Sequence, residues 1–533
     1  MIAVILAGLL SLALAQAWLR DQPQLMDAAT VTTLPCVSYA PFRRPGSTPL
    51  VLTGAVTAAQ IEEDLALLKP LTNCVRTYGV AQGLDAVPGV ARKLGMRVRQ
   101  GVWLGRDDAA NRVEIERAVA LAHDYRDVID VLIVGNEVLL RRDLSVEQLT
   151  GYVRAVKSRT DIKVTYADVW EFWQRHARLQ SEVDWVTVHI LPYWEDEPVA
   201  AHVAADHVFK IAHDMQTLFA GKPIWVGETG WPAAGRQRAG ARPSVFEQTL
   251  LVRQLVSRAI TEGVDINIIE AFDQPWKRAL EGAMGGAWGL FSADGVRRVN
   301  LSGDVIEGPD GRPVFVGAGV GALLALIALW VSALIGKQTR QPASMTAANL
   351  TAGIGAALIG VSVASHMAFI VLSSRTSRES INAYAIAAIV LAATIVMLWV
   401  LSGEPSQSIE RARRRARSLA RAHMTLLFVA ASWALILVAD PRYRGFPRAL
   451  FALPAALSAC FMLLKKRGDT HDYLRRESLF LAWALVLATA VMVIQEGVAN
   501  TEALALAGCW VLLAAPLIIK AMTRSGERQA REE

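Results

Sequence analysis

Cysteine is scarce in this chain, which has only four among 533 residues. None of the four forms a CxxC pair or joins a histidine cluster, which argues against a structural zinc site. Cys36 and Cys74 lie in the amino-terminal half, at the starts of what we expect to be neighbouring strands. A disulfide and two buried free thiols both fit this placement. We favour free thiols, because unpaired cysteine is among the most buried residue types.

Charge is also sparse: 20% of the residues are charged, and the formal net charge is only +6. Many basic residues lie in short loops between apolar runs, so they report membrane topology and do not indicate a nucleic-acid partner. No glycine-rich phosphate loop follows the first predicted strand, and no nucleotide-sugar transferase motif is evident. The sequence therefore predicts neither a metal nor an organic cofactor.

Apolar residues, in contrast, are abundant and unevenly distributed. They make up 53% of the chain, and the mean hydropathy is +0.31. The sequence is mixed and globular up to Arg312, and long apolar runs dominate beyond it. We predict a soluble domain at 31–303, a linker at 304–312, an all-α transmembrane domain at 313–522 in a lipid bilayer, and a tail at 523–533.

The predicted transmembrane domain contains seven apolar segments, and the loops between them alternate in charge. We place the segments at 313–336, 349–372, 381–401, 424–439, 447–464, 478–494 and 503–520. Loops after the odd-numbered segments carry seventeen Lys and Arg residues, and the other loops carry five. The positive-inside rule then predicts a cytoplasmic carboxyl terminus and a soluble domain on the other side of the membrane.

Residues 1–19 form a further apolar run, which ends near the small residues Ala13, Ala15 and Ala17. This pattern is typical of a signal peptide with an A-x-A cleavage site and also of an uncleaved signal anchor. No Lys or Arg precedes the run and Arg20 follows it, so its own charges orient it poorly. We favour the anchor.

Between residues 33 and 300, short apolar strands alternate with helical stretches. We expect strands at Cys36–Tyr39, Cys74–Tyr78, Val98–Leu104, Val131–Glu137, Lys163–Ala167, Trp185–His189, Ile224–Glu228 and Ile266–Phe272. Eight strands, each followed by a helix or long connection, are typical of an α/β protein of the (β/α)8 barrel type. A doubly wound open sheet is the alternative, which the missing phosphate loop disfavours.

Two of these strands end in a glutamate. Val131–Glu137, VLIVGNE, ends in Glu137, and Lys222–Pro232, KPIWVGETGWP, places Glu228 where its strand stops. Two glutamates at two strand ends are what retaining glycoside hydrolysis needs, with carboxyl groups roughly 5–5.5 Å apart. We therefore predict that Glu137 and Glu228 are catalytic.

Other polar and aromatic residues collect at the predicted strand ends. They are Tyr39, Arg76, Tyr78, Trp103, Asn136, Asp168, Trp170, His189, Tyr193, Trp194, Trp231, Glu270, Asp273, Trp276 and Lys277. Core packing or a structural ion pair explains any one of them equally well. Because active sites of (β/α)8 barrels lie at the carboxyl ends of the strands, we predict that the set surrounds one mouth. We expect these residues, Trp103 and Trp170 excepted, to bind substrate together with Trp288.

The motifs GNEV at Gly135–Val138 and GETGWP at Gly227–Pro232 resemble the signatures of glycoside hydrolase family 17, the β-1,3-glucanases and glucanosyltransferases. HILPYWE at His189–Glu195, EAFDQPWK at Glu270–Lys277 and WGLF at Trp288–Phe291 extend the resemblance over about 31–300. It implies a (β/α)8 fold and a retaining mechanism, with Glu137 as acid/base and Glu228 as nucleophile. Asn136 would bond the sugar 2-hydroxyl, and the sugar faces would stack on Trp231, Trp276, Trp288, Tyr193 and Trp194.

The fusion of such a domain to a multi-span membrane domain resembles bacterial β-(1→6)-glucan synthases. This implies an inner-membrane enzyme facing the periplasm, which cleaves β-1,3-glucan and transfers the glycosyl unit to another glucan, with other membrane proteins of glucan synthesis as partners. Simple hydrolysis, a non-catalytic role in glucan binding or export, and a transporter are the alternatives. Two features depart from the family: Gln274 replaces the second Glu of EAFDEPWK, and the catalytic pair lies only 91 positions apart, which leaves no room for the subdomain of the plant members.

Overall fold

The computed structural model describes residues 1–26, 28–51, 55–307, 311–335, 347–402, 408–464 and 476–532. The chain forms two compact units. Gln24–Val305 is the barrel unit, and Met1–Pro23 joins Ile306–Glu533 in the helical unit. Part of the predicted linker, at 308–310, and parts of three predicted loops, at 336–346, 403–407 and 465–475, lie outside the described residues.

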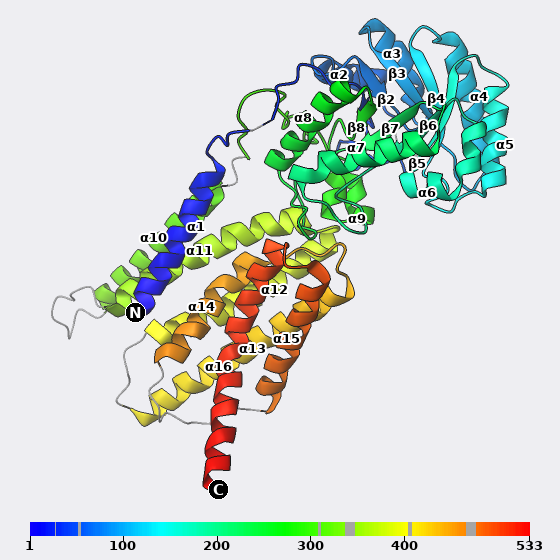
Figure 1. The fold of residues 1–533 in the computed structure, drawn as a ribbon. Coiled ribbons are helices and arrows are strands. Elements are labelled where there is room, and N and C mark those ends of the chain that lie inside the picture. The colour runs from blue at the N-terminus through cyan, green and yellow to red at the C-terminus, as the bar shows by residue number, and fades with distance from the viewer. Residues whose placement is uncertain are drawn as a thin grey trace. The chain divides into compact units, whose positions relative to one another are not determined.

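The barrel unit is a closed barrel of eight parallel strands, so the predicted α/β (β/α)8 class is confirmed (Figure 1). The strands are β1 Val37–Ser38, β2 Cys74–Arg76, β3 Arg97–Val102, β4 Ile129–Asn136, β5 Lys163–Val169, β6 Trp185–His189, β7 Ile224–Thr229 and β8 Asp265–Ile268. They follow one another in sequence order around the barrel, and β8 pairs with β1 to close it. The carboxyl ends of all eight strands therefore meet at one rim.

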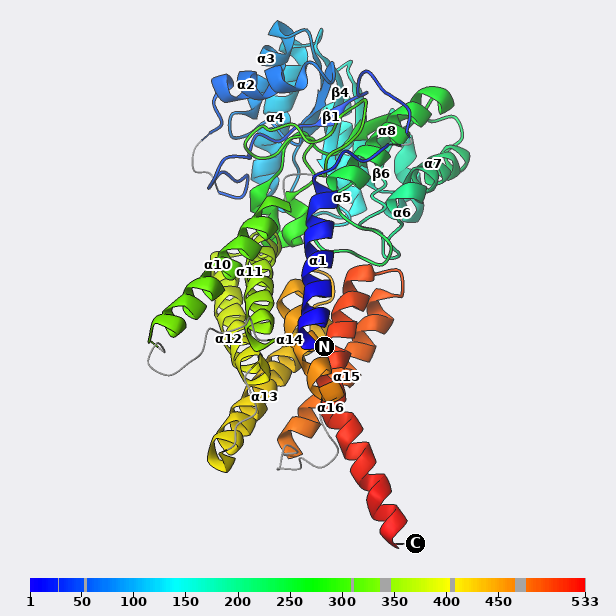
Figure 2. The ribbon, with the colours of Figure 1, turned by 90° about the vertical axis from the view of Figure 1, so that its left-hand side faces the viewer.

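Helices surround the barrel and cover its outer face (Figure 2). They are α2 Ala58–Leu68, α3 Val87–Lys93, α4 Asp108–Asp124, α5 Val146–Lys157, α6 Trp170–Arg175, α7 Ala201–Leu218 and α8 Val245–Glu262, with α9 Arg278–Glu281 after β8. Side-chain caps fix where helices begin. Thr57 accepts from the Gln60 amide, and Ser145 forms a capping box with Gln148.

Inside the barrel, Val131, Ile133, Ala167 and Trp225 pack as one apolar cluster. Trp225 is the middle of the Ile-Trp-Val run that opens β7, and it is almost fully buried. The guanidinium of Arg99 lies 4.3 Å from the centre of a Trp225 ring, so this cluster carries a cation beside an aromatic face. Because this apolar cluster fills part of the interior, we expect functional polar side chains at the rim formed by the carboxyl ends of the strands.

Cys36 and Cys74 form a disulfide, so the prediction of two free thiols is wrong. The reason is the register of β1 on β2. Val37 pairs with Val75, which places the two preceding cysteines opposite each other with Cα atoms 4.5 Å apart. Facing cysteines at that separation meet the geometric requirement for a bond.

The helical unit contains a helix at each of the seven predicted segments. These are α10 Arg312–Ile335, α11 Ala347–Ser373, α12 Ser377–Ser402, α13 Ile409–Ala439, α14 Arg448–Leu464, α15 Arg476–Glu496 and α16 Thr501–Glu532. Among the described residues, seven helices are long and apolar enough to cross a membrane, and these include the amino-terminal α1, Ile2–Arg20, but not α14. Helix α14 has 17 residues, which rise only about 25 Å.

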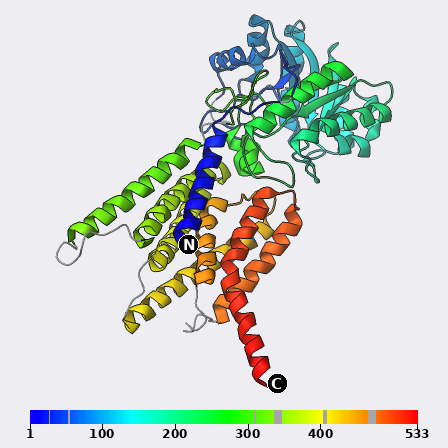
Figure 3. The same ribbon diagram turned by 60° about the vertical axis from the view of Figure 1, so that its left-hand side comes forward.

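Helix α1 packs in the helical unit against α10 and α11 (Figure 3). Leu6 is fully buried in the main core of the unit, and Ala17 packs with Val314, Ala318 and Val361. At the end of α1, Asp21 accepts a hydrogen bond from the Gly311 amide. Although the whole barrel separates α1 from α10 in sequence, the two helices belong to one core.

Candidate active site

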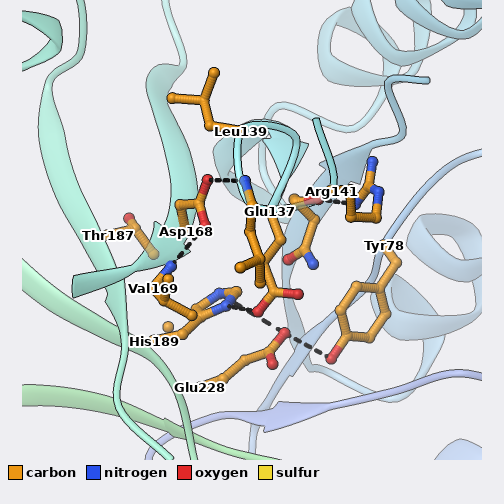
Figure 4. A network of polar contacts seen from close by, with 12 residues as sticks. Tyr78, Glu137, Leu139, Arg141, Asp168, Val169, Thr187, His189 and Glu228 are labelled. Atoms are coloured by element: carbon orange, nitrogen blue, oxygen red, sulfur yellow. Dashed lines mark hydrogen bonds and ion pairs between the residues drawn. The ribbon is translucent and has the colours of Figure 1, made fainter. Parts of the chain in front are cut away.

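Two glutamates and a histidine meet at the carboxyl-terminal rim of the barrel (Figure 4). Glu137 directly follows β4, His189 ends β6, and Glu228 lies in β7 beside His189. The Nδ1 atom of His189 lies 2.8 Å from Glu137 Oε1, and its Nε2 atom lies 3.7 Å from Glu228 Oε1. One oxygen of each glutamate and one nitrogen of the histidine all lie within 4.8 Å of one another. The two glutamates, 91 positions apart in sequence, thus lie side by side at one site in the fold.

Glu228 is buried and held by donors. Arg76 Nη1 lies 2.5 Å from Glu228 Oε1, and the Tyr78 hydroxyl donates to the same oxygen at 3.0 Å. Burial alone would raise the pKa of Glu228, but the positive charges of His189, Arg76 and Lys277 and the Arg76 hydrogen bond hold it below its usual range. Glu228 is therefore ionised at neutral pH and fixed in one orientation.

Glu137 is half-buried and occupies an unusual backbone position. Its φ angle is +53°, in the left-handed region that side chains other than glycine rarely adopt. The Glu137 amide donates to the Ala167 carbonyl at 2.7 Å, and the Glu137 carbonyl accepts from the Arg141 amide at 2.8 Å. Such a conformation persists only where surrounding contacts hold it.

A buried tyrosine–aspartate pair on β5, Tyr166 and Asp168, holds the turn that follows Glu137. The Tyr166 hydroxyl donates to Asp168 and accepts from the Leu139 amide at 3.1 Å, and Asp168 Oδ2 accepts from the Leu140 amide at 3.4 Å. Asp168 Oδ1 accepts from its neighbour Val169. Burial raises the pKa of Asp168 to about 6. Both side-chain oxygens of Asp168 thus bond to the protein itself, and the contact of Asp168 with substrate stays a prediction.

Glu270, Lys277 and Glu281 form a second charged group near the pair. Lys277 Nζ lies 3.1 and 3.0 Å from the two carboxylate oxygens of Glu270. Burial raises the pKa of Glu270 to about 7, against the opposing charge of Lys277. Burial also raises the pKa of Glu281. The positive charge of Lys277 opposes that rise, and the negative charges of Glu137 and Glu228 add to it. We did not predict Glu281 from sequence, and its spacing of four from Lys277 was the only signal for it.

Asn136 joins the same rim. Its side-chain oxygen accepts from Arg76 Nη2, while Arg76 Nη1 also donates to the Gly227 carbonyl at 3.1 Å. One buried guanidinium therefore ties the end of β4 to the end of β7. Arg76, Tyr78, Asn136 and His189 all contact one of the two glutamates or each other, as their predicted place at one mouth requires.

Two other residues predicted to bind substrate, Tyr39 and Asp273, are paired with other groups of the protein. The Tyr39 hydroxyl donates to Asp64 of α2 at 2.9 Å, outside the barrel wall. Asp273 pairs with Arg298 at 2.6 Å and accepts from the Gly289 amide, and burial raises its pKa to about 6. Neither bond joins Tyr39 or Asp273 to Glu137 or Glu228, and a role of the two residues in substrate binding stays a prediction.

The predicted sugar-stacking aromatics divide by burial. Trp231 and Tyr193 are fully buried and pack on each other edge to face, and the Trp231 indole donates to the Arg242 carbonyl. Trp288 is nearly buried and stacks on the half-buried Trp194 with an interplanar angle of 13°. Half-buried Trp276 donates to the Gln274 oxygen. Trp231 and Tyr193 are thus enclosed by other parts of the protein.

Gln274, which departs from the family pattern, is satisfied by its surroundings. Its amide nitrogen donates to the carbonyls of Ala40 at 2.8 Å and Phe272 at 3.2 Å, and its oxygen accepts from Trp276. A carboxylate has no hydrogen to donate to those two carbonyls. The amide is therefore the side chain that this position requires.

Glu137, His189 and Glu228 offer one oxygen, one nitrogen and one oxygen, a donor set that could in principle hold a cation. Glu228 Oε1 is already held by Arg76 and Tyr78, whose positive charge and hydroxyl hydrogen compete with a metal. The geometry is that of two carboxyl groups facing one another across a polar space. That arrangement can supply a nucleophile and a general acid.

The barrel has recognisable relatives. A family model of the BtgE/BtgC glycoside hydrolase domain matches residues 36–289. The probable glucan endo-1,3-beta-glucosidase btgC of Aspergillus fumigatus is 28% identical over 271 residues, which cover 46% of this chain and 39% of the relative. A glucan 1,3-beta-glucosidase of Candida albicans is 27% identical over 256 residues, covering 44% of this chain and 83% of the relative.

Among solved structures, a glycoside hydrolase family 17 beta-1,3-glucanosyltransferase from Rhizomucor miehei is similar at 25% identity with a TM-score of 0.45, covering 51% of this chain and 99% of that one. This chain spans about two fifths of the length of the btgC relatives it matches. The family match ends at residue 289, within the barrel unit. Through its barrel, the chain is thus similar to the BtgE/BtgC glycoside hydrolase domain and to proteins named as glucan β-1,3-glucosidases.

Proposed function

We propose that this protein is a membrane-anchored, retaining β-glucan-active enzyme that cleaves β-1,3-glucan. The observation that carries the proposal is the pair Glu137 and Glu228, whose oxygens approach within 4.8 Å. Retaining glycosidases place their two carboxyl groups about 5–5.5 Å apart, whereas inverting enzymes need about 6.5–9.5 Å to admit a water molecule. The curated relatives are named as β-1,3-glucosidases, which supports a β-1,3-glucan donor.

The roles follow from the surroundings of each carboxyl group. Glu228, ionised and oriented by Arg76 and Tyr78, attacks the anomeric carbon and forms a glycosyl–enzyme ester as the glycosidic bond breaks. Glu137 gives its proton to the departing oxygen and then, as a carboxylate, takes a proton from the incoming hydroxyl. That hydroxyl attacks the anomeric carbon and releases Glu228. Two displacements leave the configuration retained.

The incoming hydroxyl decides the product. Water gives hydrolysis, and a sugar hydroxyl gives transfer, with a β-1,6 bond where the acceptor presents its 6-hydroxyl. We infer transfer, because a membrane tether would keep the enzyme beside its glucan. Simple hydrolysis is the second candidate, and a non-catalytic protein of glucan binding or export is the third.

We further infer that the enzyme lies in a bacterial inner membrane with the barrel facing the periplasm and the carboxyl terminus in the cytoplasm. The Cys36–Cys74 disulfide supports this, because disulfides persist in oxidising compartments and are rare in the cytosol. The excess of Lys and Arg in alternate loops supports the same orientation. Other membrane proteins of glucan synthesis would then act beside it.

The test uses the full chain in detergent, incubated with laminari-oligosaccharides. Shorter products indicate hydrolysis, and longer or β-1,6-linked products indicate transfer. Glu137→Gln and Glu228→Gln should each lower turnover by several orders of magnitude, and Glu116→Gln, an exposed glutamate paired with Arg159, should not. Azide should rescue Glu137→Ala with retained configuration and Glu228→Ala with inverted configuration. A folded wild-type protein that yields no product from any β-glucan would contradict the proposal.

A further inference from the structure

Trp103 is an exposed aromatic beside the catalytic strand. It directly follows β3, whose last residue, Val102, pairs with Val134 of β4. Its exposed fraction is 45%, whereas Trp231, Trp288 and Tyr193 at the same rim are buried. An isolated exposed tryptophan is unremarkable in itself, so its surroundings decide what it means.

The first of these surroundings is Arg141. Its guanidinium carbon lies 4.3 Å from the centre of a Trp103 ring. The same guanidinium donates to the carbonyl of Asn136, the residue before Glu137, and to the carbonyl of Leu104 at 2.8 Å, and it pairs with Asp143 at 2.8 Å. Arg141 lies beside the Glu137 turn in Figure 4. The indole is thus stacked on a cation that is itself fastened to the strand carrying Glu137.

The second is the backbone under Trp103. The Trp103 amide donates to Glu114 of α4 at 3.2 Å, and the same carboxylate oxygen accepts from the Val80 amide at 2.7 Å. At Gly79, a Cβ atom would lie 3.2 Å from the Trp103 Cβ and 2.8 Å from a Glu114 oxygen. Backbone amides that follow β2 and β3 therefore bond to the same buried glutamate, Glu114. These bonds fix the backbone position from which the Trp103 indole extends.

We propose that the exposed face of Trp103 is a stacking platform for a glucose residue of a β-glucan, in a subsite next to Glu137. The inference rests on the proposed function and adds a specific binding residue to it. A glucopyranose in a β-linked chain presents apolar C–H faces, which pack on an aromatic ring while its hydroxyls stay hydrated. A platform held in place before substrate arrives loses little side-chain entropy on binding.

A binding experiment tests the platform apart from turnover. The full chain carrying Glu228→Gln is titrated in detergent with laminaritetraose and laminarihexaose by calorimetry. Adding Trp103→Ala should weaken Kd for laminarihexaose about tenfold, as the loss of one aromatic contact predicts. Trp103→Phe should recover most of the affinity. Melting temperatures of each variant check that the protein remains folded.

The chain offers a matched control. Arg92 stacks on Tyr125 with its guanidinium 4.4 Å from the ring centre, so Tyr125→Ala removes the same kind of cation-backed aromatic at the α3–α4 side of the barrel. It should leave Kd unchanged. If adding Trp103→Ala to the Glu228→Gln protein leaves Kd unchanged, the platform is contradicted and the proposed function is not. If the Glu228→Gln protein binds no oligosaccharide and the wild type cleaves none, both the proposed function and the platform are contradicted.

In the active enzyme, the product ratio places the subsite. If Trp103→Ala lowers the ratio of transfer to hydrolysis at unchanged donor cleavage, the platform holds the acceptor. If it lowers kcat/KM for donor cleavage about tenfold at an unchanged ratio, the platform holds the donor. Either result supports stacking, and an unchanged ratio with unchanged kcat/KM contradicts it.

Discussion

At the scale of single residues, the site depends on charge around Glu228. The carboxylate takes part in two bonds with different character, one to the Arg76 guanidinium and one to the Tyr78 hydroxyl. Both favour the ionised form, which is the form that attacks. Because the pKa of Glu228 lies below its usual range, we expect the acid limb of the pH profile to fall below pH 4.5.

Tyr78→Phe should move that acid limb to higher pH and lower kcat about tenfold at pH 7. The hydroxyl that stabilises the carboxylate is lost, so the pKa of Glu228 rises and a larger fraction is protonated at a given acidic pH. The profile of kcat/KM against pH measures the shift. A limb that stays in place would show that Tyr78 does not act on Glu228.

Tyr166→Phe should lower kcat about tenfold with little change in KM. It removes the hydroxyl that bridges Asp168 and the Leu139 amide, and thereby loosens the turn carrying Glu137. Tyr39→Phe is the control, because it deletes an equivalent buried bond to Asp64 away from the site. Both variants should lose about 1 kcal/mol of stability, and equal losses of activity would contradict a positioning role for Tyr166.

At the scale of elements, the weakest strand carries a covalent tie. Strand β1 has two residues, and the disulfide fastens it to β2. The bond closes a loop with a sequence separation of 38, for which loop entropy gives about 3–4 kcal/mol. The barrel therefore closes between β8 and β2 through a short strand that a disulfide holds in place.

Replacing both Cys36 and Cys74 by serine should lower the melting temperature of the barrel by several degrees or more, and a reductant should do the same to the wild type. Cys460→Ser with Cys509→Ser is the control, since both are free thiols in the helical unit. Thiol labelling of the unfolded, unreduced chain should find two reactive cysteines. Four would contradict the disulfide.

We also expect helix α1 to be retained in the mature protein. Leu6 and Ala17 are buried among residues of other helices in the helical unit, so removing α1 would expose their partners. A tag fused before Met1 should remain on the protein purified from membranes. A mature chain that begins after Ala17 would contradict this, and mass spectrometry of the intact protein distinguishes the two.

At the scale of the whole molecule, the stability of the barrel should depend on pH in a definite direction. Burial raises the pKa of Glu270 to about 7 and those of Asp168 and Asp273 to about 6. A carboxyl group with a raised folded-state pKa contributes stability below its unfolded pKa of about 4, and this contribution is lost as pH rises through the folded-state value. The melting temperature should therefore decrease as the pH is raised from 4 to 7.

Asp273→Asn should flatten the slope of melting temperature against pH between pH 4 and pH 6, whatever it does to absolute stability. The amide keeps an oxygen for the Gly289 amide but cannot titrate. Thermal unfolding followed by tryptophan fluorescence across that range gives the slope. A variant with the wild-type slope would show that Asp273 does not carry part of the dependence.

The sequence alone predicted much of the molecule because its signals are local. Alternation of apolar strands and capped helices predicted the barrel, and glycine-flanked glutamates predicted the two carboxyl groups. Burial was harder to predict from sequence. Trp231 and Tyr193 follow strands, as sugar-stacking residues of a barrel would, yet both are fully buried and pack on each other. Glu281 was missed, since a four-residue helix carries no periodic pattern.

By itself, the sequence determined which segments are strands, which are apolar helices and which two glutamates end strands, because hydrophobic period and residue type are properties of neighbours along the chain. Only the tertiary structure decided what lies across from what. Strand register brought Cys36 to Cys74, and the packing of α2 placed Asp64 against the Tyr39 hydroxyl. Helix packing placed α1 with α10. These outcomes depend on closing a barrel and filling a core, and a contact between residues distant in sequence is fixed only when every strand between them is in place.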